Sequence, residues 1–85
     1  MDIQKKREDD RIILKLNGRL DGYWAEHLDR EIEELLRTGA RRIQLDLADL
    51  SYMSSAGIRI LVKFKKSIQT IGGTFALCHA SDFVR

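Results

Sequence analysis

The sequence predicts a small α/β domain built on a mixed β-sheet. Short segments in which apolar and polar residues alternate are interleaved with two longer segments whose apolar residues recur at helical spacing. The resulting order is strand, strand, helix, strand, helix, strand, and strands joined through a helix are expected to run parallel. The 85 residues contain no proline and no linker-like tract. We therefore expect one domain over residues 1–85.

The chain is predicted to begin with a β-hairpin. Residues 3–8 form a weak first arm, and in residues 11–16 every second position is apolar. Two aspartates, Asp9 and Asp10, lie between the arms. Gly18 is predicted to end the second strand at the Asn-Gly pair, because glycine readily takes the positive φ of a turn.

The first helix is predicted from Ala25 onward, after a lead-in at residues 20–22. Apolar residues recur along it at a period close to 3.6, and charged residues occupy the opposite face. Gly39 is expected to end this helix. The predicted buried stripe consists of Ala25, Leu28, Ile32, Leu35 and Leu36.

The second half of the chain predicts a strand over residues 42–47, a turn over 48–50 and a helix from Ser55. Apolar residues cover most of this helix, as expected for a helix wedged between a sheet and another helix. Gly72 and Gly73 then precede a strand over 74–79, and a further helix is expected to be capped at residues 81–82. The polar strip of the second helix is Ser55, Arg59, Lys63, Lys66 and Thr70.

Composition limits the functional class. The 15 basic and 13 acidic residues leave a net charge of +2, too small a field to indicate nucleic acid or an anionic membrane as the partner. Apolar runs are too short for a membrane span, no secretory leader is evident, and a cytoplasmic location is expected. Cys78 is the only cysteine, which excludes an internal disulfide; its apolar neighbours in the sequence predict a buried, inert thiol.

Ser54 and Ser55 are the candidate site residues. They lie where a strand passes into a helix, and the unpaired N–H groups and helix dipole there stabilise a negative charge. From the residues alone, the favoured interpretation is that the two serines are a helix N-cap and its neighbour. The alternative is that they form an anion or phosphate site.

Motifs of catalysis and of cofactor binding are not found. The Ser-Ala-Gly segment lacks the glycine that a nucleophile elbow needs, and neither a P-loop nor a dinucleotide-binding pattern occurs. His27 beside Glu26, and His79 beside Cys78, form no metal-binding set. We therefore predict no enzyme activity, no metal and no cofactor.

Three stretches together resemble the STAS domains of the anti-sigma factor antagonist group. They are NGRLD at 17–21, IQLDLADLSYMSSAGIRIL at 43–61 and IGG at 71–73. The resemblance implies a protein-binding module whose partner is an anti-sigma factor that is also a serine kinase. It implies phosphorylation of a serine at the start of the helix after the third strand, which is Ser55, with Ser54 as the second choice. The partner-binding residues that it implies are Asp21, Ser54, Ser55, Gly57, Arg59 and Lys63.

The chain departs from that family pattern in two respects. The family has aspartate before the acceptor and serine or threonine after it, whereas this chain has Ser54 and Ala56. Family members also continue through further elements, so the expectation is a domain truncated at its C-terminus, with exposed apolar surface that favours a homodimer or a covering partner. Alternatives to the antagonist role are a STAS subunit of a stressosome-like or lipid-transport assembly that acts without phosphorylation, and a nucleotide-binding domain.

Overall fold

The structure, a computed structural model, describes residues 1–79 and has the predicted order of elements. Strand β1 is followed by β2, helix α1, strand β3, helix α2 and strand β4. The helix cap expected at residues 81–82 lies outside the described residues. The elements span β1 Asp2–Glu8, β2 Arg11–Leu20, α1 Gly22–Arg37, β3 Arg42–Met53, α2 Ser55–Thr70 and β4 Thr74–Cys78.

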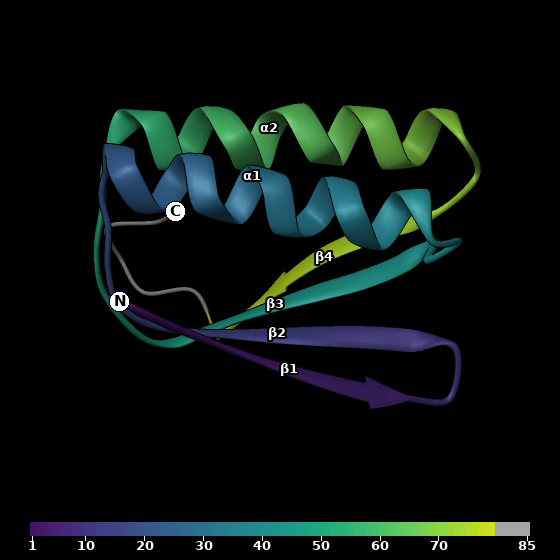
Figure 1. Ribbon diagram of the computed structural model, residues 1–85, viewed down its shortest axis with the longest axis horizontal. Helices are drawn as coiled ribbons and strands as arrows, with labels where there is room; N and C mark the ends of the chain where they lie inside the picture. The colour runs from purple at the N-terminus through teal and green to yellow at the C-terminus, as the bar shows by residue number, and fades with distance from the viewer. Residues whose placement is uncertain (80–85) are drawn as a thin grey trace.

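The four strands form one mixed sheet in the order β1-β2-β3-β4. The hairpin pairs β1 with β2 antiparallel, whereas β2 with β3, and β3 with β4, are parallel. Each parallel pair is joined through a helix, and both helices lie side by side on the same face of the sheet (Figure 1). The prediction of a mixed sheet with helical crossovers is therefore confirmed.

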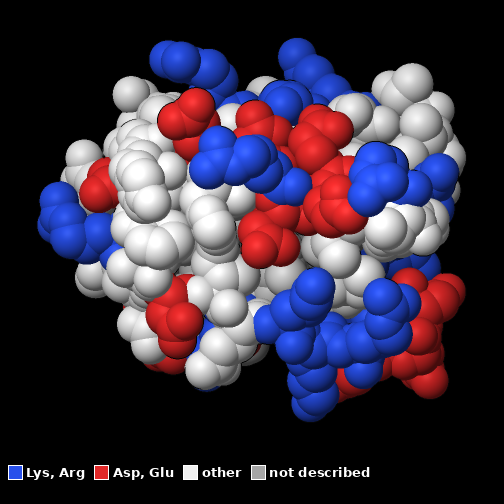
Figure 2. All heavy atoms as spheres, in the orientation of Figure 1, with Lys and Arg blue, Asp and Glu red and all other residues white. Residues whose placement is uncertain are grey.

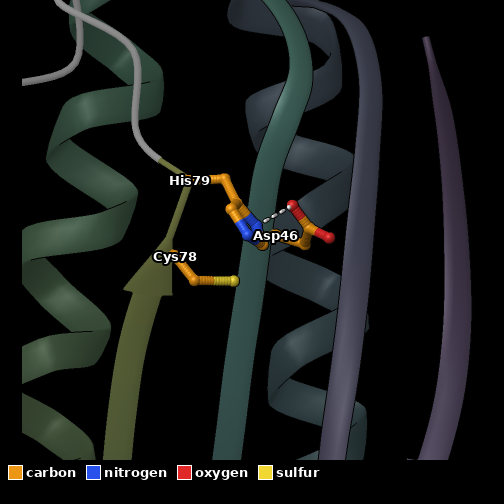
Figure 3. A group of neighbouring side chains, drawn as sticks. All are labelled: Asp46, Cys78 and His79. Atoms are coloured by element: carbon orange, nitrogen blue, oxygen red, sulfur yellow. Dashed lines mark hydrogen bonds and ion pairs between the residues drawn. The ribbon is translucent and has the colours of Figure 1, made fainter.

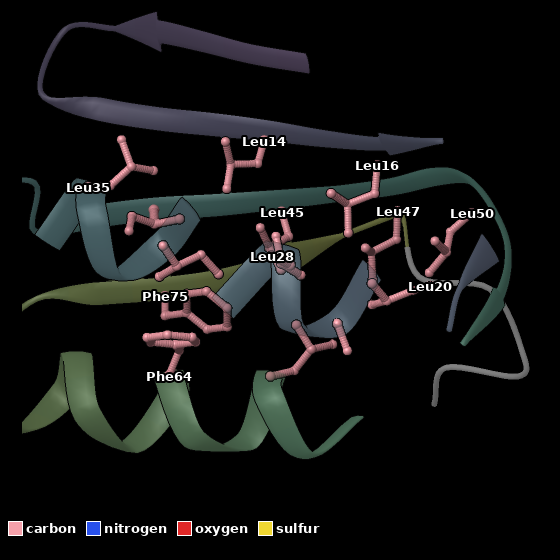
Figure 4. Close-up of a cluster of buried hydrophobic side chains, with 14 of the residues drawn as sticks. Leu14, Leu16, Leu20, Leu28, Leu35, Leu45, Leu47, Leu50, Phe64 and Phe75 are labelled. Carbon is pink, nitrogen blue, oxygen red and sulfur yellow. The ribbon is translucent and has the colours of Figure 1, made fainter. Parts of the chain in front are cut away.

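The hydrophobic core lies between the two helices and the face of the sheet that they cover (Figure 4). Alternate residues of β2 and β3 point into it, among them Leu14 and Leu45, which are fully buried register partners. The intervening residues of each strand, such as Lys15 on β2 and Asp46 on β3, point to the other face and are only half-buried. The sheet is thus apolar on one face and polar on the other, which explains the alternation seen in the sequence.

Strands β2 and β3 are longer than predicted. Gly18 does not end β2; it lies inside the strand with φ of +107°, and the register with β3 shifts just before and just after this region. Beyond the irregularity, Leu20 pairs with Met53. The expected turn at 48–50 is likewise part of β3. The glycine bends the strand without breaking its pairing, so both strands continue to the start of a helix.

Helix α2 is less enclosed than predicted. It buries Leu61 and Ile68 against the sheet. However, Ile58 is 45% exposed and Val62 is 50% exposed. The wide apolar surface of this helix is therefore covered on the sides facing the sheet and α1, and one flank meets solvent within the part of the chain that the structure describes.

Glycine ends both helices as expected. Gly39 follows α1 with φ of +106° and Gly72 follows α2 with φ of +81°, a conformation that glycine adopts without steric cost. Within residues 1–79, neither helix is long and apolar enough to cross a membrane.

Candidate functional site

Both helices begin at the same end of the sheet, where β2 and β3 finish side by side (Figure 1). The backbone N–H of Ser54 donates to the carbonyl oxygen of Leu20 at 2.9 Å. This bond joins the last residue of β2 to the residue that precedes α2. Because α1 starts directly after β2, the positive ends of both helix dipoles point toward one surface.

Ser54 is the N-cap of α2. Its Oγ accepts a hydrogen bond from the backbone N–H of Gly57 at 3.2 Å, and the residue is half-buried. Its backbone is extended, as an N-cap requires. The capping interpretation is therefore confirmed for Ser54.

Ser55 is the first residue of α2 and is exposed. Its hydroxyl makes no side-chain hydrogen bond to any other residue in 1–79. Arg59 lies one turn further on the same face; it is exposed and has no ion pair within that range. The first turn of α2 contains no acidic residue. The two serines thus differ in position: one is engaged in the fold, whereas the other presents its oxygen to solvent.

Replacing Ser54 by alanine should lower the free energy of unfolding by about 1 kcal/mol, because the capping hydrogen bond to Gly57 is lost. The matched variant Ser55→Ala should stay within about 0.5 kcal/mol of wild type, since it removes an exposed hydroxyl. Urea denaturation followed by circular dichroism measures both. Equal losses in the two variants would contradict the division of roles between the serines.

Gly57, in the first turn of α2, packs against the ends of β2 and β3. It is buried, and a Cβ at this position would lie 2.9 Å from Leu20 Cδ2 and 3.0 Å from Met53 Cγ. Glycine therefore lets the first turn of α2 pack closely over the ends of β2 and β3. Gly57 belongs to the predicted partner-binding set; what the structure shows for it is this close packing of α2 on the strand ends.

Asp21 lies at the same end of the sheet and caps α1. Its Oδ1 accepts a hydrogen bond from the backbone N–H of Trp24 at 3.0 Å. The residue is half-buried, so part of it is accessible next to the start of α2. Trp24 itself is half-buried and packs on the core.

Lys63 lies two turns along α2, away from the serines. Its Nζ is 2.8 Å from Asp29 Oδ1 and 3.5 Å from Glu33 Oε1, so it joins α2 to α1. The hydrogen bond to Asp29 is the main reason that the pKa of Lys63 is raised above its ordinary value. Of the two basic residues in the predicted partner-binding set, Arg59 and Lys63, Lys63 is the one that is ion-paired within residues 1–79.

Aromatic side chains near the serines were not part of the predicted site. Tyr23, in the first turn of α1, is 69% exposed, and Tyr52, near the end of β3, is 38% exposed. The guanidinium carbon of Arg19 lies 4.2 Å from the centre of the Tyr52 ring. A sequence signal existed, because both tyrosines fall outside the buried positions of their elements. Only the pairing of β2 with β3 shows that Tyr52 lies beside Arg19 just before the serine turn, while Tyr23 lies on the first turn of α1 at the same end of the sheet.

Charge is unevenly distributed on the face of the molecule that Figure 2 shows. In Figure 2, uncharged side chains predominate at the end where both helices begin, and acidic and basic side chains gather toward the other end. A surface of tyrosine, serine and partly exposed apolar groups is typical of a protein-binding patch. The arrangement can bind a protein and can hold an anion at the start of α2, and it brings together no set of groups for catalysis within residues 1–79.

Comparison with known proteins agrees with this description. The model of the STAS domain family matches residues 2–85. A Bordetella bronchiseptica protein named as an anti-sigma factor antagonist, BtrV, is 33% identical over 85 residues, covering 100% of this chain and 73% of that protein. An anti-sigma F factor antagonist of Paenibacillus polymyxa is 30% identical over 81 residues, covering 92% of this chain and 69% of that protein.

The fold itself is shared with solved structures of SpoIIAA. This anti-sigma factor antagonist from Bacillus has been solved in unphosphorylated and phosphorylated forms, and each gives a TM-score of 0.87. The alignments cover 99% of this chain and 78% of SpoIIAA, at 22% identity. At that identity the likeness concerns the fold.

Proposed function

Because this chain belongs to the STAS domain family, in its anti-sigma factor antagonist group, we propose that it is a phosphorylation-controlled protein-binding module. Its partner is an anti-sigma factor that is also a serine kinase. In the unphosphorylated state the chain binds that partner and thereby frees a sigma factor. This exchange takes place in the cytoplasm, and the chain takes part in it without a catalytic residue or a cofactor.

The exposure of Ser55 at the first residue of α2 is the observation that carries the proposal. A kinase must reach the acceptor oxygen, and the Ser55 hydroxyl is accessible while the neighbouring Ser54 hydroxyl is held by Gly57. Ser55 is therefore the favoured acceptor, and Ser54 would have to give up its cap to compete.

Phosphorylation would change the surface without disturbing the fold. A phosphate adds about two negative charges and three acceptor oxygens. At Ser55 these meet the N-terminal amides of α2, the positive end of its dipole and, one turn along, Arg59. The domain can thus hold the phosphate, whereas a partner that had docked against a neutral surface would meet a concentrated negative charge.

The unphosphorylated docking surface includes more than the serine. Tyr52 lies just before the turn beside Arg19, and Tyr23 is exposed on the first turn of α1 at the same end of the sheet. Asp21 and Arg19 supply one charge of each sign. Aromatic and arginine side chains often contribute most to binding energy in protein interfaces. We assign the primary contact to this end of the sheet, where both helices start.

The test is phosphorylation and binding with the anti-sigma serine kinase of the same organism. Incubation with ATP, followed by mass spectrometry of peptides, should locate one phosphate on Ser55; Ser55→Ala should abolish it and Ser54→Ala should retain it. Ser55→Asp should weaken binding of the kinase at least about tenfold through charge placed at the interface.

Ser67→Asp is the matched control, since it adds the same charge at an exposed position further along α2. It should leave the affinity unchanged. If Ser55→Asp bound the kinase as tightly as wild type, the charge-switch mechanism would be wrong.

A second candidate function is a STAS subunit that acts within a larger assembly without phosphorylation. The exposed apolar flank of α2, which includes Ile58 and Val62, supports it, because such a flank suits a lasting contact. The replacement of the family's aspartate by Ser54 points the same way. Stable binding to a partner, with no phosphate incorporated by the kinase, would favour this function over the first.

A further inference from the structure

Three different metal-ligating side chains meet on the polar face of the sheet, away from the helices. Asp46 on β3 is the register partner of Cys78 on β4, and His79 follows directly. Figure 3 shows the imidazole of His79 extending over β3 to Asp46, with the Cys78 sulfur on the same side. One ligand atom from each residue lies within 4.8 Å of the other two.

We propose that Asp46, Cys78 and His79 form a binding site for a divalent transition metal, with zinc as the ion that fits best and water as the fourth ligand. A thiolate, an imidazole and a carboxylate are ligand types that zinc accepts together. Tetrahedral zinc with ordinary bond lengths separates its ligand atoms by about 3.4–3.8 Å. The three ligand atoms, which lie within 4.8 Å of one another, would therefore need to shift by about 1 Å to reach those separations.

Two neighbouring groups donate hydrogen bonds to the proposed ligands, as residues around a bound metal commonly do. Gln44 Nε2 donates to Cys78 Sγ at 3.0 Å, and the backbone N–H of Ala48 donates to Asp46 Oδ1 at 3.0 Å. The first bond supports a thiolate, and the second holds the carboxylate in one orientation. Hydrogen bonds of this kind orient the ligands of metal sites and tune their basicity.

The site is also accessible to an ion. The side chain of His79 is 65% exposed and that of Asp46 is 21% exposed, so metal can enter from solvent without opening the core. Cys78 is half-buried beside these polar groups, so the expectation of a fully buried thiol is wrong. The apolar neighbours in the sequence were misleading because alternate residues of β4 point to opposite faces.

The simpler interpretation is a surface ion pair. His79 Nδ1 lies 3.0 Å from Asp46 Oδ1, and such a pair needs no metal. It leaves unexplained why a cysteine that receives a hydrogen bond from Gln44 lies beside the pair. Lys15, the register partner of Asp46, lies on the same face of the sheet, and its ammonium is paired with Asp49 at 3.3 Å.

Isothermal titration calorimetry of the untagged chain with zinc tests the proposal. One zinc per chain should bind, and Cys78→Ser or His79→Gln should each weaken the affinity by about tenfold or more. His27→Gln is the matched control, because His27 is the other histidine and lies on α1 near Glu31; it should bind zinc as wild type does. Circular dichroism of each variant reports whether it is folded.

Cobalt gives a second, spectroscopic readout. Bound to the wild-type chain, it should show a sulfur-to-cobalt charge-transfer band, which reports the Cys78 thiolate as a ligand, and Cys78→Ser should lose this band. Absence of saturable zinc binding, equal affinity in the two ligand variants and wild type, or a cobalt complex without the sulfur band would each overturn the site.

Discussion

Replacing Phe64 by alanine is expected to lower the free energy of unfolding by about 3–5 kcal/mol. Phe64 is completely buried where α2 meets the sheet, and its ring centre lies 6.5 Å from that of Phe75 on β4. Removing the ring takes away apolar burial and leaves a cavity between two layers (Figure 4). Domains of this size are stable by about 5–15 kcal/mol, so the variant should unfold at a markedly lower urea concentration.

Val62→Ala is the control on the same helix. Val62 is 50% exposed, so its loss should change stability by no more than about 0.5 kcal/mol. Urea denaturation at constant temperature measures both variants. A loss of less than about 1 kcal/mol for Phe64→Ala would mean that the core rearranges to fill the space, contrary to the packing described above.

Replacing Gly73 by alanine is expected to have the next largest effect, a loss of about 2–3 kcal/mol. A Cβ at Gly73 would lie 2.3 Å from the carbonyl oxygen of Arg41 and 2.7 Å from Ile68 Cγ2. The oxygen belongs to the backbone at the start of β3 and accepts a hydrogen bond from the N–H of Thr74 at 2.8 Å. The added methyl group would therefore push β4 away from β3.

Gly22→Ala is the matched control for that prediction. A Cβ at Gly22 meets nothing within 4 Å, so this variant should stay within about 0.5 kcal/mol of wild type. Thermal unfolding of both variants under the same conditions makes the comparison. If both lost the same stability, the effect would come from glycine content and not from the close approach of β4 to β3.

Local chemistry made most of the fold predictable. The stripe of α1 and the alternation in β2 and β3 reflect periods of 3.6 and 2, which depend only on nearby residues. The start of α2 was equally accessible, because an N-cap serine bonds to an N–H three residues on. The family assigned from three stretches of sequence was confirmed, and so was its anti-sigma factor antagonist group.

Strand length was not predictable from the same signals. Gly18 suggested a turn, yet β2 runs on to Leu20 because β3 pairs with it beyond the irregularity. That pairing joins residues more than thirty positions apart, and no local pattern records it. The exposed flank at Val62 was missed for a related reason, since the sequence shows that a helix is apolar but not which of its sides another element covers.

The candidate site likewise combines features that nearby residues determine with features that depend on residues distant in sequence. The sequence by itself determined that two serines begin a helix, that Gly57 follows them and that Arg59 shares a face with Ser55. Only the tertiary structure decided that Ser55 is exposed, that Tyr52 lies beside Arg19 just before the two serines, and that Asp46 meets Cys78 and His79. The physical reason is that periodicity and capping act within one or two turns, whereas burial and ligand geometry depend on the register of strands distant in sequence.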